Sequence, residues 1–332
     1  MKLIDYGVRH DEKKYIQEWS QANGIEVKIV TDLLTPETVK MAEGYDGVVA
    51  YQQLPYDEKV FDQMNEYGIH VISLRNVGVD NVPVEALKRN QIRLTNVPSY
   101  SPEAIAEYSV IGLMALLRNM KHMIRKVDQN DFRWAPDIGR ELNQLTVGVA
   151  GTGRIGRAAI KIYQGFGAKV IAYDKFHNPE IEKEGLYVDD LDTLLKESDV
   201  VTLHIPSLGK GNTLINSKTI SEMKDDAIVI NTARGDLVNT SDLYDAVAGG
   251  KLYGAVLDVY ENEVGIFNSD LSDQGLTDEL LEKVIKSPRF ILTPHIAFYT
   301  TKAVKNMATV SLNSMVEELN TGTSKNEVDF SK

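Results

Sequence analysis

Three glycines in the spacing G-x-G-x-x-G stand between a short apolar run and a helical pattern. They are Gly151, Gly153 and Gly156. A second apolar run at 170–173 follows the helical pattern and ends on Asp174. This order of strand, turn, helix, strand and acid is typical of a βαβ unit that binds a dinucleotide.

Each position of this motif has a physical role in binding a pyrophosphate. Gly151 permits the tight turn, Gly153 lets the pyrophosphate approach the backbone, and Gly156 lets the helix pack close to the strand. The N-terminus of the helix offers free N–H groups and a partial positive charge to the phosphates. Asp174 follows 18 residues after Gly156, near the spacing of an acid that binds a ribose 2′-hydroxyl. The motif therefore predicts NAD rather than NADP. The alternative is a glycine-rich turn that binds nothing, but this would not explain why three glycines and an acid at the end of the next strand occur together.

Length, charge and composition exclude several classes of function. A chain of 332 residues predicts about two domains of ~150 residues each. Its net charge of −12 argues against nucleic acid and anionic membranes as partners. The chain has no cysteine, which excludes disulfides and thiolate chemistry. It also lacks a signal-peptide core, a membrane-spanning run and a cluster of metal ligands, so we expect a cytoplasmic protein without a metal.

The first hundred residues alternate between strand and helix patterns. The predicted strands lie at 3–6, 27–30, 47–51, 71–74 and 92–95. Helical patterns between them predict a parallel, doubly wound sheet. One of these helices is expected to begin at Thr35-Pro36, with Thr35 as its N-cap.

The glycine motif belongs to a second set of strands. They lie at 147–150, 170–173, 200–203, 227–230, 254–257 and 290–293, the number expected of a dinucleotide-binding fold. A last helix at 300–319 has no strand partner nearby, so we expect it to return to the first domain. The acidic stretch 261–285 is expected to be a solvated loop and helix.

An arginine, a glutamate and a histidine follow three strands of this second set. Arg234, Glu263 and His295 come after the strands at 227–230, 254–257 and 290–293. Ligands of open α/β sheets bind beyond the carboxyl ends of the strands. An arginine fork binds a carboxylate, a histidine transfers a proton near neutral pH, and a carboxylate beside it selects its tautomer. The set suits hydride transfer to a 2-oxo acid.

Each of these residues taken alone has a plainer interpretation. Arg234 is consistent with a surface ion pair, Glu263 with a solvated acid, and His295 with a histidine of the core. His204 also follows a strand, and we expect it to be structural. The four other histidines, His10, His70, His122 and His177, are expected to be surface or structural residues. Gly78 and its neighbours after the fourth strand form either an anion-binding nest or an ordinary turn. The joint placement at strand ends favours the catalytic interpretation of the first three.

Several long segments resemble the D-specific 2-hydroxyacid dehydrogenase family over essentially the whole chain. They are LRNVGVDN (74–81), NVPSYSPEAIAE (96–107), RWAPDIGRE (133–141), GTGRIG (151–156), NTARGDLV (231–238), DVYENEVGIFN (258–268) and TPHIAFYTT (293–301). The resemblance implies two α/β domains with doubly wound parallel sheets. A flavodoxin-like substrate domain would comprise 1–100 and 299–332, and an NAD-binding Rossmann domain 101–298. It also implies a homodimer formed through the cofactor domains.

The resemblance also implies roles for individual residues. Arg234 would bind the substrate carboxylate, and His295, paired with Glu263, would be the general acid and base. The substrate-binding residues would be Tyr51, Val77, Gly78, Tyr100 and Phe298. The residues in contact with the cofactor would be Gly151, Gly153, Arg154, Ile155, Gly156, Asp174, Pro206, Thr232, Ala233 and Asp258.

The choice of substrate rests on two aromatic side chains. Tyr51 and Phe298 suggest a tight pocket that takes pyruvate and D-lactate, because relatives that act on D-2-hydroxyisocaproate have a smaller or non-aromatic residue in place of Tyr51. One methylene group in an apolar pocket contributes only ~1–3 kcal/mol of discrimination, so larger 2-oxo acids stay open as the alternative. A binding protein that senses NAD without turnover is the alternative from another class.

Overall fold

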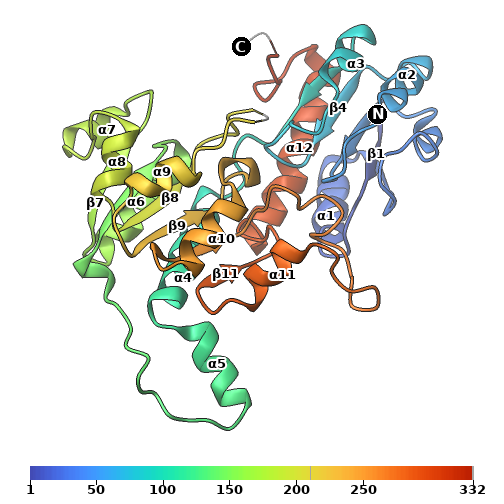
Figure 1. Ribbon diagram of the computed structural model, residues 1–332. Helices are drawn as coiled ribbons and strands as arrows, with labels where there is room; N and C mark the ends of the chain where they lie inside the picture. The colour runs from blue at the N-terminus through green and yellow to red at the C-terminus, as the bar shows by residue number, and fades with distance from the viewer. Residues whose placement is uncertain (210, 331–332) are drawn as a thin grey trace. The chain divides into compact units, whose positions relative to one another are not determined.

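The computed structural model describes residues 1–209 and 211–330 (Figure 1). The chain divides into two compact units. Unit 1 consists of Met1–Ser101 together with Tyr299–Lys332, and unit 2 is Pro102–Phe298. Each unit contains one sheet with buried apolar clusters on both of its faces, so each has a core of its own.

Unit 1 is a five-stranded parallel sheet in the order β2-β1-β3-β4-β5, the doubly wound order of flavodoxin. All five predicted strands are confirmed. The elements are β1 (Lys2–Tyr6), α1 (Lys13–Asn23), β2 (Glu26–Ile29), the 3₁₀ helix η1 (Val39–Ala42), β3 (Gly47–Ala50), α2 (Glu58–Glu66), β4 (Val71–Leu74), α3 (Val84–Arg89), β5 (Arg93–Thr95) and α12 (Thr301–Thr321).

The helix α12, drawn in red, packs along β3 and β4 as the sequence predicts for the last helix (Figure 1). Met315 lies so close to Gly47 that a Cβ on this glycine would be 2.3 Å from its sulfur. The Ser73 hydroxyl of β4 donates a hydrogen bond of 2.9 Å to the Ser311 carbonyl. Thr300 caps the helix by accepting from the Ala303 amide. The last helix is therefore an integral part of the first sheet's core.

The predicted helix at Thr35-Pro36 is wrong. The chain forms turns there and then the short 3₁₀ helix η1. The Thr38 hydroxyl accepts from the Thr35 amide at 2.9 Å and donates to the Leu33 carbonyl at 2.6 Å. A threonine side chain that bonds to nearby backbone groups competes with helical hydrogen bonds, and this explains the difference.

Unit 2 is a six-stranded parallel sheet in the order β11-β10-β9-β8-β6-β7. The strands are β6 (Thr146–Ala150), β7 (Lys169–Tyr173), β8 (Val200–Leu203), β9 (Ala227–Asn231), β10 (Leu252–Leu257) and β11 (Phe290–Leu292). All six predicted strands are confirmed. Beyond β7, a one-residue parallel bridge between Ala172 and Tyr187 takes the place of a further strand. The order reverses at β6, and sheets of this kind bind ligands beyond the carboxyl ends of the strands at such a reversal, which here are β6 and β8.

Helices cover both faces of this sheet. The helical elements of unit 2 are α4 (Pro102–Leu117), α5 (Met120–Asp128), η2 (Leu142–Gln144), α6 (Arg154–Gly165), α7 (Pro179–Lys183), α8 (Leu191–Glu197), α9 (Ser217–Glu222), η3 (Gly235–Leu237), α10 (Thr240–Ala248) and α11 (Glu279–Lys286). The helix α4 packs against α6 and β10, and a Cβ on Gly112 would be 2.3 Å from Val256. The helix α5 has no buried residue and extends away from the sheet of unit 2 (Figure 1).

The acidic stretch 261–285 is only partly the solvated loop and helix that the sequence predicts. The helix α11 lies within it, but the preceding loop has a small core of its own. Tyr260, Phe267 and Leu281 are buried together in this core. Isolated apolar residues among many acids do not show a periodicity, so the sequence pattern does not reveal the cluster.

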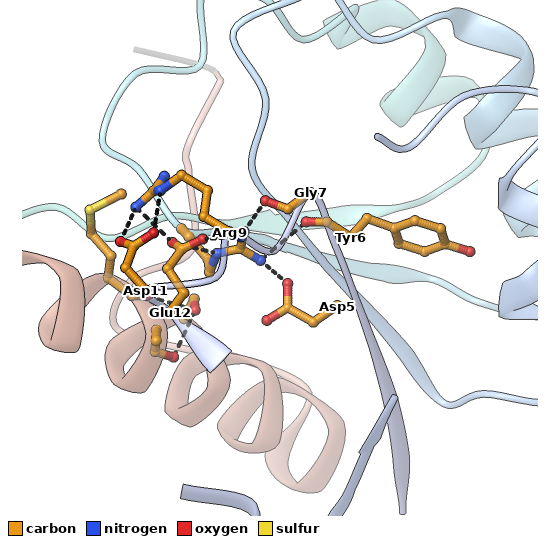
Figure 2. A network of polar contacts seen from close by, with 10 residues as sticks. Asp5, Tyr6, Gly7, Arg9, Asp11 and Glu12 are labelled. Carbon is orange, nitrogen blue, oxygen red and sulfur yellow. Dashed lines mark hydrogen bonds and ion pairs between the residues drawn. The ribbon is translucent and has the colours of Figure 1, made fainter. Parts of the chain in front are cut away.

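A buried arginine ties the strand end of β4 to that of β1. Arg75 is completely buried, and its guanidinium donates to Asp5, to the Tyr6 carbonyl at 3.1 Å and to the Gly7 carbonyl at 2.9 Å. It also contacts the buried carboxylate of Glu12 at 3.3 Å; Figure 2 shows these partners converging on one guanidinium. Burial lowers the pKa of Arg75 to about 9, which still leaves the group charged at neutral pH.

We predict that Arg75→Leu strongly destabilises unit 1. Removing one partner of a buried ion pair leaves the other charge uncompensated, which typically costs about 3–5 kcal/mol. Urea unfolding followed by tryptophan fluorescence measures the loss, because Trp19 of unit 1 is buried whereas Trp134 of unit 2 is already 81% exposed.

The control for this prediction is Arg89→Leu. Arg89 pairs with Glu58 and Asp62 on the surface of the same unit, and exposed pairs contribute little to stability. Its unfolding midpoint should stay near that of the wild type. Equal midpoints for the two variants would contradict the structural role of Arg75.

Candidate active site

The glycine motif forms the turn between β6 and α6. Gly151 has φ +97°, and a Cβ there would be 2.5 Å from the His204 carbonyl oxygen. A Cβ on Gly156 would be 1.9 Å from the Gly151 carbonyl oxygen. A Cβ on Gly153, in contrast, would meet no atom within 4 Å. Two glycines are thus required by the fold itself, whereas the third leaves open space beside the start of α6.

Asp174 lies directly after β7 and contacts this turn. Its Oδ2 accepts from the Thr152 amide at 2.6 Å and from the Thr152 hydroxyl at 3.1 Å. Its Oδ1 accepts from the Phe176 amide at 3.0 Å. A carboxylate oxygen accepts two hydrogen bonds, so Oδ1 retains the capacity for a ligand hydroxyl. The acid is therefore held against the glycine turn with one oxygen still able to bind.

The side chain of Asn231, the last residue of β9, holds the segment that follows this strand. The Asn231 Oδ1 accepts from the Ala233 amide at 3.0 Å, and its Nδ2 donates to the Arg234 carbonyl at 2.7 Å. The Thr232 hydroxyl is buried and has no hydrogen-bond partner within the described residues. A buried polar atom without a partner is unusual in a folded protein, and it indicates a place where a bound molecule completes the site.

His295 and Glu263 form a close histidine–carboxylate pair at this edge of the sheet. The His295 Nδ1 lies 2.7 Å from the Glu263 Oε1, and the other carboxylate oxygen accepts from the Tyr260 amide at 2.9 Å. The two side chains are 30% and 18% exposed. A carboxylate only accepts, so Nδ1 carries the hydrogen. Nε2 has no hydrogen-bond partner among residues 1–209 and 211–330.

A buried carboxylate shapes the turn that carries this histidine. The Asp258 Oδ1 accepts from the Thr293 hydroxyl at 2.7 Å and from the Ile296 amide at 2.9 Å. Its Oδ2 accepts from the Ala297 amide at 2.8 Å. Burial raises the pKa of Asp258, and these hydrogen bonds oppose the rise. His295 itself has φ +57° and donates its amide to the Asp258 carbonyl at 2.7 Å.

The structure brings the three predicted catalytic residues to one edge of one sheet. Arg234, Glu263 and His295 follow β9, β10 and β11, which are neighbours in the sheet. The predicted cofactor residues lie at the same edge of unit 2. Arg154 and Ile155 open α6, Pro206 follows β8, and Thr232 and Ala233 follow β9. Asp258 follows β10, but both of its carboxylate oxygens are engaged with the turn at 293–297.

The predicted substrate residues divide between the two units. Tyr51, Val77, Gly78 and Tyr100 belong to unit 1, where Tyr51 follows β3 and the Val77-Gly78 pair follows β4; Phe298 is the last residue of unit 2. Asn96 Nδ2 donates to the Val77 carbonyl at 2.7 Å. A trans peptide points its C=O and N–H in opposite directions, so this bond turns the Gly78 amide away from Asn96. The amides of Val77 and Gly78 donate no hydrogen bond to the part of the chain that the structure describes.

The sequence predicts a structural role for His204, whose buried Nδ1 has no hydrogen-bond partner among the described residues. Its Nε2 lies 3.0 Å from the Thr202 hydroxyl, and burial lowers its pKa to about 4. The four other histidines lie at least partly on the surface. Within the described residues no group of three or more His, Asp or Glu side chains is arranged to hold a metal ion. No described helix is long and apolar enough to cross a membrane.

Sequence reasoning missed the residues that hold the site residues in place. Thr152 and Thr293 bond to Asp174 and Asp258, and Arg9 contacts Tyr51. Thr293 and Arg9 both follow strand ends, so the criterion that selected Arg234 would also have found them. No local pattern marks Thr152 as the partner of an acid 22 residues away.

The residues present fit a dinucleotide. The open space at Gly153 admits a phosphate, the α6 N-terminus has no side-chain cap, Asp174 retains an acceptor, and the Thr232 hydroxyl has no partner in the described part of the chain. Those four features lie at the carboxyl ends of β6, β7 and β9, on both sides of the point where the strand order reverses. This is where dinucleotides bind to such sheets.

Comparison with known proteins agrees with this fit. Residues 110–297 match the family model of the D-isomer specific 2-hydroxyacid dehydrogenase, NAD binding domain. The D-lactate/D-glycerate dehydrogenase of Pediococcus acidilactici is 53% identical over 330 residues, which are 99% of this chain and 100% of that protein. The D-lactate dehydrogenase of Lactiplantibacillus plantarum is 49% identical over 331 residues, with 99% and 100% covered.

A solved structure shows the same likeness in three dimensions. The structure of a D-2-hydroxyisocaproate dehydrogenase superposes with a TM-score of 0.91 at 41% identity and covers 99% of both chains. The chain therefore belongs to the D-isomer specific 2-hydroxyacid dehydrogenases, a family of NAD-dependent oxidoreductases.

Proposed function

We propose that the chain is an NAD-dependent D-lactate dehydrogenase that interconverts pyruvate and D-lactate. The observation that carries the proposal is the His295–Glu263 pair, whose free Nε2 lies on the same sheet edge as Arg234 and the glycine turn. The names of relatives at 53% and 49% identity support lactate as the substrate. The solved structure at 41% identity is instead named for a larger substrate, D-2-hydroxyisocaproate.

His295 supplies the proton in the proposed reaction. When bound, NADH supplies the hydride that adds to the carbonyl carbon of pyruvate. The proton on the His295 Nε2 moves to the carbonyl oxygen and completes the hydroxyl group of D-lactate. Glu263 accepts from Nδ1 at 2.7 Å, so it fixes the ring orientation and stabilises the imidazolium form. The histidine then regains its proton from solvent.

Arg234 orients the substrate in this proposal. A guanidinium fork binds a carboxylate through two parallel hydrogen bonds, which a lysine ammonium does not reproduce. The amides of Val77 and Gly78 are proposed as further donors to the same carboxylate. Tyr51, Tyr100 and Phe298 are proposed to enclose the methyl group.

The cofactor residues have roles that follow from their positions. Gly151, Gly153 and Gly156, with Arg154 and Ile155, are proposed to hold the pyrophosphate. Asp174 is proposed to accept from a ribose hydroxyl and to repel a 2′-phosphate. Pro206, Thr232 and Ala233 are proposed to contact the nicotinamide half. Asp258 is also proposed to contact the cofactor, because it follows β10 at the same edge of the sheet. Its carboxylate holds the turn at 293–297.

We propose a homodimer formed through unit 2. The helix α5 has no buried residue, and the helix and the loop after it expose large apolar side chains. These are Met120, Ile124, Val127, Phe132, Trp134 and Ile138, which are 48–89% exposed. Monomers rarely leave so many apolar side chains together on one surface.

We also infer a cytoplasmic location, since a chain without cysteine needs no disulfides from an oxidising compartment.

We predict that Ile124→Asp weakens the dimer. A charge in the centre of an apolar interface is desolvated without a partner, so sedimentation velocity should show monomers at micromolar concentration where the wild type is dimeric. Leu54→Asp, at an exposed apolar residue of unit 1, should leave the wild-type state unchanged. A wild-type monomer would refute the proposal.

The test of the function is NADH oxidation with pyruvate and with 2-oxoisocaproate in parallel, followed by chiral analysis of the product. We expect faster turnover of pyruvate and D-lactate as the product. Faster turnover of 2-oxoisocaproate would assign the enzyme to the larger hydroxy acid. Binding of NADH without oxidation by either substrate would favour a protein that senses the cofactor.

We predict different kinetic effects for substitution of the two proposed active-site residues. His295→Gln should lower kcat by roughly 10²–10⁴-fold, the usual contribution of a general acid, with little change in NADH affinity. Arg234→Lys should raise KM for pyruvate as well as lower kcat. His70→Gln, at an exposed histidine of unit 1, is the control. Wild-type turnover in His295→Gln would remove the proton-transfer role.

A further inference from the structure

A chain of hydrogen bonds runs through two hydroxyl groups and ends on the carboxylate of Asp174. The Asn178 amide donates to the Tyr187 hydroxyl at 2.8 Å. The hydroxyl oxygens of Tyr187 and Thr152 lie 2.7 Å apart, and the Thr152 hydroxyl donates to the Asp174 Oδ2 at 3.1 Å. A hydroxyl has one hydrogen to donate, and a carboxylate only accepts. Because the Thr152 hydrogen goes to Asp174, Tyr187 donates its own hydrogen to Thr152, and the direction of the whole chain is fixed.

Tyr187 attaches the loop 174–178, which joins β7 to α7, to the glycine turn. Its ring stacks on the ring of His177, with the centroids 3.9 Å apart and the planes 5° from parallel. Its hydroxyl holds the next residue, Asn178, and reaches Thr152 of the turn. The amides of Lys175 and His177 donate no hydrogen bond within residues 1–209 and 211–330. The loop therefore depends on side-chain contacts for its position.

The backbone at Tyr187 is held independently of this side chain. Tyr187 forms the one-residue parallel bridge with Ala172 of β7. The Ala172 amide donates to the Leu186 carbonyl at 2.8 Å, and the Val188 amide donates to the Ala172 carbonyl at 3.0 Å. A substitution at Tyr187 thus changes the attachment of the loop while the backbone beside β7 keeps its hydrogen bonds.

Asp174 has one acceptor position left for a ligand. A carboxylate has about four lone-pair positions. Both positions on Oδ2 are taken by the amide and the hydroxyl of Thr152, and one on Oδ1 is taken by the Phe176 amide. The position that remains is on Oδ1, beside a bond to the loop 174–178. Its direction therefore depends on where this loop lies.

We propose that Tyr187 is a positioning residue for the cofactor, which directs the remaining acceptor of Asp174 toward the ribose 2′-hydroxyl of the adenosine half. The proposal rests on the proposed function, in which Asp174 binds this ribose. Tyr187 acts from both sides of the acid, through the loop by way of Asn178 and through the turn by way of Thr152. NADPH has a phosphate in place of the 2′-hydroxyl, so the contribution of Tyr187 is specific to NADH.

The test is Tyr187→Phe, which removes the hydroxyl and keeps the ring that stacks on His177. The Kd of NADH, measured by titration of its fluorescence without substrate, should rise roughly 2- to 10-fold, as for the loss of one hydrogen bond. The effect is limited to this size because the Thr152 amide still holds Asp174 at 2.6 Å. The Kd of NADPH should not change. Equal weakening of both cofactors, or an unchanged Kd of NADH, would overturn the proposal.

The matched control is Tyr253→Phe. This tyrosine lies near the amino end of β10, at the opposite edge of the same sheet, and its hydroxyl donates to the Asn119 Oδ1 at 3.4 Å. The substitution removes the same chemical group from the same unit, so both cofactors should bind as they do to the wild type.

Two substitutions of Thr152 test the middle of the chain. Thr152→Val removes the hydroxyl, so it should raise the Kd of NADH in the same direction as Tyr187→Phe. Thr152→Ser keeps the hydroxyl and should bind NADH like the wild type. Equal weakening in the two variants would assign the effect to the methyl group and contradict a role for the hydrogen-bond chain.

A double variant separates this inference from the proposed role of Asp174. Asp174→Ala should weaken NADH, and adding Tyr187→Phe should then have no further effect. Wild-type affinity in Asp174→Ala would refute the proposed role of the acid itself. Weak binding in Asp174→Ala together with full additivity of Tyr187→Phe would refute only the positioning role.

A measurement on the protein without cofactor tests the attachment of the loop directly. In Tyr187→Phe the Asn178 amide loses its acceptor, so its hydrogen exchange, followed by NMR, should become faster than in the wild type. The same amide should exchange at the wild-type rate in Tyr253→Phe. Unaltered exchange in Tyr187→Phe would show that the hydroxyl does not hold the loop.

Discussion

The hydrogen bonds of the Asp258 carboxylate are the interaction on which the candidate catalytic geometry depends. A left-handed backbone conformation at a non-glycine residue costs about 1–2 kcal/mol, and His295 has this conformation with φ +57°. Three hydrogen bonds from Thr293, Ile296 and Ala297 to one buried acid offset this cost. They fold the turn so that the imidazole meets Glu263, whose second oxygen is held by the backbone at Tyr260.

The parallel arrangement of strands explains why much of this site is predictable from sequence. The carboxyl ends of parallel neighbours meet at one edge, so residues that follow strands in the sequence gather in space. This criterion identifies Arg234, Glu263 and His295 from the sequence alone, and the apolar runs identify all eleven strands. The catalytic roles of these three residues come from the likeness to a known family. The sequence pattern alone does not distinguish a catalytic arginine from one that forms a surface ion pair.

The features that escaped prediction depend on side chains that bond to distant or competing partners. The turn at Thr35 differs from a helix because the Thr38 hydroxyl takes two backbone partners. The cluster of Tyr260, Phe267 and Leu281 buries apolar groups with no period. In the same way, Asp258 looks like any acid after a strand, and only the structure shows that its partners lie 35–39 residues further along the chain.

The path of the chain through unit 1 has a consequence for its synthesis. The β1–β5 sheet is translated first, but the face that contains Leu3, Val49 and Val71 is buried against α12, whose residues come roughly 200 positions later. Unit 2 is continuous, with its last strand ending at Leu292. Domains generally fold as units while the ribosome adds residues. The segment that emerges first from the ribosome is therefore completed last, because its apolar face is fully covered only when the final helix has been made.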